Sequence, residues 1–229
     1  KDERIQPPSV YASTKLSGEI LAKTILDESN TKVLIPRFFT VYGPYGRPDM
    51  SILRFIHWII NKEEVQVFGD GEQRRSFTYV DDVVSALVKV MSHTSSDTFN
   101  IGSNNTVTLN RVIELIEEST GINSIVVNKE RAMKDPDVVK PDLSHIKQTL
   151  DWEPTTLIED GIEKTVEWYL ENLELLKSLT YELCKKNIST ISLAPGPFKT
   201  NRIKKLVDNL KEFEKNLPLQ KIGNPDDIG

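Results

Sequence analysis

Tyr11 and Lys15 are the residues whose types and spacing most directly suggest chemistry. Side chains four residues apart lie on one face of an α-helix, so these two can meet. A free phenol loses its proton only at a pH of about 10, but a nearby ammonium group favours the phenolate. Such a phenolate can accept a proton from an alcohol while a hydride leaves to a nicotinamide. The same spacing also occurs on ordinary surface helices, so the pair alone is a weak signal.

Regular hydrophobic spacing predicts the helix that carries this pair, from about residue 10 to residue 28. A β-rich apolar run at 32–39 predicts a buried strand directly after it. Asp81, Asp82 and Asn110 are expected to cap two later helices. Strands and helices alternate along the chain, which indicates an α/β fold. Further helices are expected at 51–61, 83–92, 110–118, 144–150, 158–186 and 201–215, and further strands at 65–68, 76–80, 98–101, 124–128 and 188–194.

The composition argues against several classes of protein. The chain has 229 residues, a net charge of −5 and a single cysteine, Cys184, so no internal disulfide forms and a cytoplasmic location is expected. It has no long basic block, which argues against nucleic acid as a partner. No apolar run is long enough to span a membrane. His57, His93 and His145 are scattered without ligand spacing, so no metal site is expected.

Several longer motifs follow the Tyr–Lys pair in a fixed order. The run RFFTVYGPYGRPDM at 37–50 resembles the loop after the catalytic helix in UDP-glucuronate 4-epimerases. The run VFGDGEQRRSFTYVDD at 67–82 resembles their nucleotide-binding stretch. FNIG at 99–102, KPDLS at 140–144 and LDWEPT at 150–155 follow in the order of their substrate domain. Residues 1 to about 175 are therefore similar to the extended short-chain dehydrogenase/reductases of the NAD-dependent epimerase/dehydratase family.

The resemblance implies roles for residues around the expected nicotinamide. Tyr11 would be the base that deprotonates the C4 hydroxyl of the sugar. Lys15 would hold the nicotinamide ribose and tune Tyr11, so both residues would also bind NAD. Phe39 would lie near the nicotinamide, and Thr40 near the sugar or the phosphate.

The resemblance also implies a binding site for a UDP-sugar. Arg47 would bind the carboxylate of a uronic acid, because a planar guanidinium offers two parallel hydrogen-bond donors. Val67 and Phe68 would flank the uracil. Arg75 would pair with the diphosphate, and Arg131 is a further candidate for that contact although its motif matches poorly.

The dinucleotide-binding signature is missing from the chain. A Rossmann-type fold needs a Gly-rich turn whose backbone amides meet the pyrophosphate, and the eleven glycines contain no G-x-G-x-x-G. Gly69 and Gly71 come nearest, but Arg74 stands where the third glycine belongs. The family's third catalytic residue, a Ser or Thr, would lie before Lys1. We therefore expect the C-terminal part of a Rossmann-type enzyme with its substrate domain, lacking the N-terminal dinucleotide-binding half and inactive alone.

The tail from about 176 to 229 does not continue this pattern. The stretches at 191–200 and 218–228 are similar to the C-terminal part of 3-oxoacyl-carrier-protein reductases, another branch of the short-chain dehydrogenases. Tyr181 and Lys185 repeat the spacing of the catalytic pair but lie too close to the following strand to serve as one. The expected domains are therefore 1–175 and 176–229.

Three hypotheses about function remain open. The first is an NAD-dependent UDP-sugar 4-epimerase that oxidises C4 transiently and acts on UDP-glucuronate or UDP-galacturonate. The second is a UDP-sugar decarboxylase or dehydratase of the same family. The third is a non-catalytic remnant that binds UDP or a partner protein. The resemblance also implies a homodimer that forms through the helix bearing Tyr11.

Overall fold

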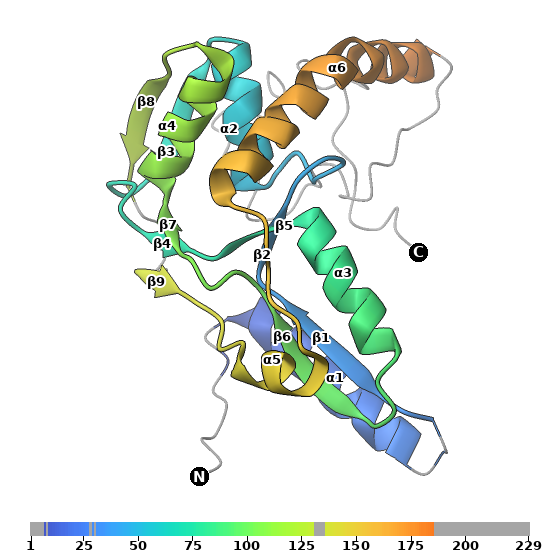
Figure 1. The fold of residues 1–229 in the computed structure, drawn as a ribbon. Coiled ribbons are helices and arrows are strands. Elements are labelled where there is room, and N and C mark those ends of the chain that lie inside the picture. The colour runs from blue at the N-terminus through green and yellow to red at the C-terminus, as the bar shows by residue number, and fades with distance from the viewer. Residues whose placement is uncertain (1–6, 8, 28, 30, 131–135, 186–229) are drawn as a thin grey trace.

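A computed structural model describes residues 7, 9–27, 29, 31–130 and 136–185, with side chains as far as residue 173. Within these residues the hydrophobic core falls into two clusters, one for each lobe of the ribbon in Figure 1. We call the lobe built on strands β1 and β6 the sheet lobe, and the lobe built on helices α2, α4 and α6 the helical lobe. Both contain helices and strands, which confirms the predicted α/β class.

The sheet lobe is a parallel strand pair with helices on both faces. Strand β1 (Leu34–Phe38) pairs with β6 (Asp97–Ile101). Side chains alternate between the faces of a strand, and both Arg37 and Thr98 contact α1 (Val10–Asp27), so α1 lies on that face. Phe99 and Ile101 point to the other face, where they pack in a core with α3 (Val80–Met91) and α5 (Ser144–Leu150).

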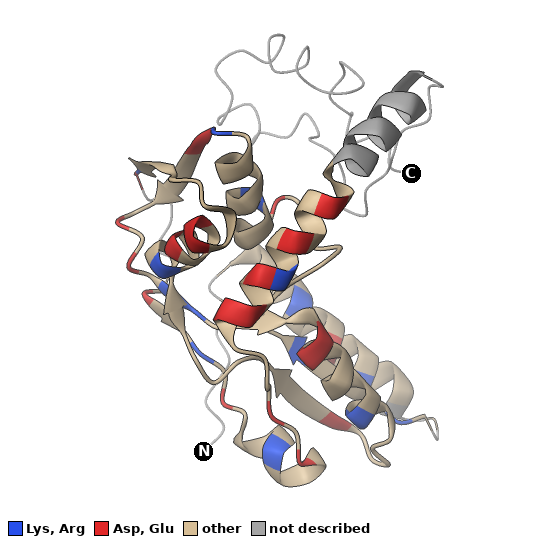
Figure 2. Cartoon of the chain, turned by 45° about the horizontal axis from the view of Figure 1, so that its top comes forward, with Lys and Arg blue, Asp and Glu red and all other residues tan. Residues whose placement is uncertain are grey.

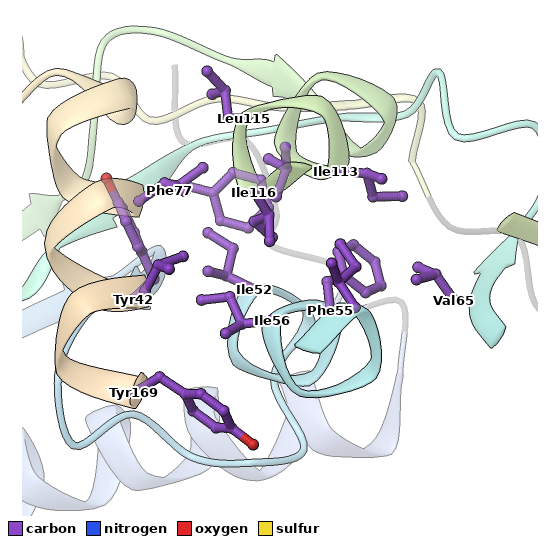
Figure 3. Packing of buried hydrophobic residues seen from close by; sticks show 14 of the residues in the cluster. Tyr42, Ile52, Phe55, Ile56, Val65, Phe77, Ile113, Leu115, Ile116 and Tyr169 are labelled. Atoms are coloured by element: carbon purple, nitrogen blue, oxygen red, sulfur yellow. The ribbon is translucent and has the colours of Figure 1, made fainter. Parts of the chain in front are cut away.

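The helical lobe holds the larger core. Its elements are α2 (Ser51–Ile60), β3 (Glu64–Phe68), α4 (Leu109–Thr120), β8 (Ile125–Lys129) and α6 (Ile158–Lys185), and β3 pairs parallel with β8. Their apolar faces meet in the cluster of Figure 3. Helix α6 buries Ile162, Val166 and Tyr169 there, while Figure 2 shows its acidic residues on the outer face. This one-sided pattern is what holds α6 on the lobe.

Short strands connect the two lobes. Strand β2 (Thr40–Tyr42) pairs parallel with β5 (Phe77–Tyr79). Strand β4 (Arg74–Arg75) lies between β7 (Val107–Thr108) and β9 (Val138–Val139). The sequence predicted β1, β3, β5, β6 and β8 within two residues, but β2, β4, β7 and β9 were not predicted. A strand of two residues has no alternation that could reveal it.

The predicted caps of α3 were wrong. This helix begins at Val80 and has Tyr79 at its N-cap position, so Asp81 and Asp82 lie inside its first turn. Asp82 is buried, and its carboxylate accepts hydrogen bonds from the backbone N–H groups of Thr155 (3.1 Å) and Thr156 (3.0 Å). Asp82 therefore fastens the segment that leads into α6, and no local pattern could predict such a distant partner.

The predicted cap of α4 was also wrong by two positions. Thr108 is the N-cap, and its hydroxyl accepts a hydrogen bond of 3.1 Å from the Arg111 N–H. The Asn110 amide instead donates to the Asp70 carbonyl at 3.0 Å and to Glu72 at 2.6 Å. Asn110 thus ties α4 to the loop after β3.

The remaining predictions about the fold have different outcomes. Helices α1, α2, α5 and α6 lie within a residue or two of their predicted bounds. No helix in the described part of the chain is long and apolar enough to cross a membrane. Across the same residues, no group of three or more His, Cys, Asp or Glu side chains could hold a metal ion. The strand predicted at 188–194 and the helix predicted at 201–215 lie outside the described residues.

Candidate active site

Tyr11 and Lys15 lie on the first turns of α1. Ser9 precedes the helix, and its hydroxyl accepts a hydrogen bond of 3.1 Å from the Ala12 N–H, as an N-cap does. The Tyr11 side chain is 71% exposed, so its phenol can reach a ligand. The Lys15 ammonium lies 5.4 Å from the centre of the Tyr11 ring. The structure therefore brings the predicted pair together on an accessible helix face.

An ion pair fastens this helix to the sheet. Arg37 on β1 donates from Nε to Glu19 Oε1 at 2.7 Å and from Nη2 to Oε2 at 2.5 Å. Further along α1, the Lys23 ammonium donates to the Thr98 hydroxyl on β6 at 3.3 Å. Glu19 stands four residues after Lys15 on the same helix. The Glu19–Arg37 pair therefore sets where Tyr11 and Lys15 stand relative to β1.

Glu19→Gln is expected to lower the free energy of unfolding at neutral pH by about 1 kcal/mol, because the bidentate ion pair is lost. The Arg37 hydrogen bond holds the pKa of Glu19 below its ordinary value of 4.5. A lowered pKa means that the pair stabilises the chain fully above pH 4.5 and progressively less as the pH falls through that lowered value. Urea unfolding of both proteins, measured between about pH 3 and pH 7, checks this.

Glu114→Gln is the matched control for this prediction. Glu114 belongs to an ion pair with Arg111 on the surface of α4, with the two side chains 56% and 40% exposed. Its loss is expected to change the free energy of unfolding by less than about 0.5 kcal/mol. Equal losses in the two variants, or a Glu19→Gln effect that persists at acid pH, would contradict the proposed tether.

Phe39 lies where the carboxyl ends of β1 and β6 meet. A Cβ added to Gly102, just after β6, would lie 3.3 Å from Phe39 and 2.6 Å from Cγ of Pro141. Asn100 on β6 donates to the Asp142 carbonyl at 3.1 Å. Segments that stand far apart in the sequence therefore converge at this edge. In open parallel sheets, ligands bind beyond the carboxyl ends of the strands.

Arg47 lies in the loop between β2 and α2. It donates from Nε to Asp49 Oδ1 at 3.0 Å and from Nη2 to Oδ2 at 2.5 Å. The same loop holds Tyr45 with a φ of 59°, and its ring lies 5.0 Å from the Trp168 ring on α6. Arg47 and Thr40 both line a cavity of about 10 Å³, room for roughly one water molecule.

Arg47 and Asp49 shift each other's pKa. The Asp49 hydrogen bonds raise the pKa of Arg47, and the negative charge of Asp49 adds to this effect. Hydrogen bonds from Arg47 in turn lower the pKa of Asp49. The residue predicted to bind a sugar carboxylate therefore already has a carboxylate partner within its own loop.

The predicted uracil-binding residues differ in their exposure. The Val67 side chain is 1% exposed and belongs to the core of the helical lobe, so its contact with a base would use its main chain. Phe68, at the end of β3, is 43% exposed. Gly71 follows with a φ of 80°, and a Cβ there would overlap the Asn110 amide. The Gly69–Gly71 pair therefore forms a tight turn after Phe68.

The predicted diphosphate-binding residues have separate outcomes. Arg75 on β4 is partly buried, and its Nη1 donates to the Arg74 carbonyl at 2.8 Å. The neighbouring Arg74 points elsewhere, because its guanidinium donates to the Thr106 carbonyl at 2.8 Å. Arg131 lies outside the described residues. A larger hollow of about 410 Å³ lies beside the amino end of β6 and contains none of the predicted site residues.

Sequence reasoning assigned no role to Glu19, Asp49 or Ser76. The Ser76 hydroxyl is buried, donates to the Ser103 carbonyl at 2.9 Å and accepts from the Ser103 N–H at 2.9 Å. It therefore ties β5 to the segment after β6. Glu19 stands at helical spacing from Lys15, and Asp49 stands in the same motif as Arg47. These two positions could therefore have been predicted to lie near the site.

Known proteins share both the sequence and the topology of this region. Residues 1–102 match the NAD dependent epimerase/dehydratase family. Over 174 residues the chain is 39% identical to the UDP-glucuronate 4-epimerase of Thermodesulfobacterium geofontis. The aligned region covers 76% of this chain and 54% of that relative. It is 29% identical over 172 residues to UDP-glucuronic acid decarboxylase 1 of Xenopus tropicalis. That aligned region covers 74% of this chain and 41% of the decarboxylase.

A solved structure agrees with these relatives. UDP-glucuronic acid 4-epimerase from Bacillus cereus, in complex with UDP-glucuronic acid and NAD, has a TM-score of 0.70 and 30% identity, covering 75% of this chain and 55% of that one. The chain spans about half the length of the curated relatives it matches. The predicted relation to Rossmann-type short-chain dehydrogenases is thereby confirmed. The matched part of this chain belongs to the NAD-dependent epimerase/dehydratase family of extended short-chain dehydrogenase/reductases.

Proposed function

We propose that the protein carrying this chain is an NAD-dependent UDP-sugar 4-epimerase whose substrate is a UDP-uronic acid, UDP-glucuronate or UDP-galacturonate. The observation that carries the proposal is the pairing of Tyr11 with Lys15 on α1, where the Lys15 ammonium lies 5.4 Å from the centre of the exposed Tyr11 ring. The pair supplies a group that can take a proton from a sugar hydroxyl, and the loop after β2 supplies Arg47, a group that can hold a sugar carboxylate. The Bacillus cereus relative, which binds UDP-glucuronic acid and NAD, supports the same ligands for this chain.

The residues at the edge of the sheet lobe suit a nicotinamide. Gly102 has no room for a side chain, because a Cβ would press on Phe39 and Pro141, so the chain packs closely at the edge where Phe39 would meet the nicotinamide. NAD, when bound, supplies the acceptor for the C4 hydride. Tyr11 Oη takes the proton of the C4 hydroxyl, and the Lys15 ammonium stabilises the resulting phenolate charge. Return of the hydride to the other face of the C4 ketone would set the opposite configuration, and Tyr11 gives the proton back to the C4 oxygen.

The family's decarboxylases are the second candidate, and one of them is among the relatives. A 4-keto uronic acid is a β-keto acid and can lose its carboxylate as carbon dioxide. A guanidinium that holds the carboxylate anion opposes that loss, because the carboxylate gives up its charge as it leaves. The loop that carries Arg47 therefore favours epimerisation.

The 229 residues by themselves are proposed to bind UDP and to turn over no UDP-glucuronate. Phe68, Gly71 and Arg75 supply the nucleotide side of the site, whereas no Gly-rich turn is present for the pyrophosphate of NAD. Epimerisation by these residues alone would refute this part of the proposal. The predicted homodimer would use the exposed apolar side chains of α1, which include Ile20, Leu21 and Ile25.

Arg75→Ala tests the diphosphate assignment. We expect the variant to bind UDP about 10- to 100-fold more weakly, because charge-assisted hydrogen bonds to the phosphates are lost. Arg111→Ala is the control, since it removes the same charge from the surface of α4, where Arg111 pairs with Glu114 and Glu118. Calorimetric titration of both variants with UDP is the measurement. Unchanged binding in Arg75→Ala would remove Arg75 from the site.

A further inference from the structure

The Arg47 guanidinium already holds a carboxylate, and that carboxylate belongs to the chain. Asp49 accepts from Nε at 3.0 Å and from Nη2 at 2.5 Å, the bidentate arrangement in which an arginine would read a uronic acid. The two side chains are 61% and 53% exposed, so burial does not force them together. A ligand carboxylate therefore meets a guanidinium whose charge is largely neutralised.

We propose that Asp49 is a specificity-determining residue that weakens the preference of Arg47 for a charged sugar, so that UDP-uronic acids and neutral UDP-hexoses compete more evenly. This inference rests on the proposed function, because it concerns the same sugar site. UDP-glucuronate and UDP-glucose differ at C6 by one negative charge. The free energy that separates their binding therefore depends on the net charge around Arg47.

Two effects of Asp49 act in the same direction. Its carboxylate occupies donors that a ligand carboxylate would use, so the ligand has to displace it or share Nη2 with it. Its negative charge also repels an incoming anion over a short range, since both residues lie near the surface where salt screens distant charges. A neutral hexose experiences neither effect, so Asp49 changes the ratio of the two affinities.

The test is calorimetric titration of the whole chain with UDP-glucuronate, UDP-glucose and UDP. Asp49→Asn is expected to tighten UDP-glucuronate binding about three- to fivefold, the size of one exposed ion pair, and to leave UDP-glucose and UDP unchanged. In an Arg47→Ala background the same substitution is expected to have a smaller effect, because only the direct repulsion between Asp49 and the ligand carboxylate remains.

Asp151→Asn is the matched control. It removes the same charge at an exposed position with a φ of 48°, a left-handed conformation that asparagine tolerates. The ratio to compare is the affinity for UDP-glucuronate divided by the affinity for UDP-glucose. If Asp49→Asn leaves this ratio unchanged, the inference is overturned. If the ratio falls, Asp49 orients Arg47 instead, which also overturns the inference. Failure of all proteins to bind UDP and UDP-glucose would refute the proposed nucleotide site, and the inference with it.

Discussion

Gly161→Ala is expected to lower the free energy of unfolding by about 3 kcal/mol, because it overfills the core between β2 and α6. A Cβ at Gly161 would overlap the Tyr42 hydroxyl and lie 2.8 Å from Cζ of the ring. Tyr42 is 6% exposed, and Figure 3 shows it against α6. Its ring also packs edge-on against Phe77 and Tyr79, with centroids 6.3 and 5.6 Å away, so it cannot move aside freely.

Gly18→Ala is the control, with the opposite sign. Gly18 lies in α1, and a Cβ there would meet nothing within 4 Å. Alanine is expected to stabilise that exposed helical position by about 0.5–1 kcal/mol, since glycine loses more backbone freedom on folding. Urea unfolding of both variants measures the difference. A Gly161→Ala protein as stable as the parent would contradict the packing of α6 on Tyr42.

Tyr11→Phe is expected to slow C4 epimerisation by about 10²- to 10⁴-fold in the NAD-loaded protein that carries this chain, because the proposed base for the hydroxyl proton is lost. The substitution removes one exposed oxygen and leaves the ring in place. The affinity for UDP is therefore expected to stay the same. Steady-state rates with UDP-glucuronate and a separate UDP titration measure the two quantities.

Two results would contradict this assignment. A Tyr11→Phe protein that retains its rate would show that another residue is the base. A parallel loss of rate and of UDP affinity would show that Tyr11 supports the structure of the site. Ser13→Ala, also on α1, serves as a control, because Ser13 bonds the Ser9 carbonyl within the first turn and should affect the rate little.

The elements that the sequence predicted well are those with long hydrophobic patterns. Helices α2 and α6 bury one face each, so the spacing of apolar residues marks their bounds. The caps failed because a short polar side chain can serve either the helix or a distant segment. Asp82 serves the segment before α6, and the capping of α4 is done by Thr108. Local patterns do not distinguish these uses.

The site was predictable as a set of motif positions, and less so as a set of contacts. Tyr11 and Lys15 meet because helical geometry requires it. The bond between Glu19 and Arg37 joins a helix to a strand across 18 positions, so it depends on how α1 packs on β1. The pairing of Arg47 with Asp49 depends on the path of the loop after β2. The periodicity of the sequence carries no information about such tertiary contacts.

The isotope content of the product tests the central claim most directly. The NAD-loaded protein that carries this chain would be given UDP-glucuronate with deuterium at C4, and the product would be analysed by NMR and mass spectrometry. Transient oxidation at C4 predicts UDP-galacturonate that keeps the deuterium at C4, with no release of carbon dioxide. A UDP-pentose with carbon dioxide would establish a decarboxylase, and binding without any product would establish a non-catalytic protein; either result would contradict the epimerase.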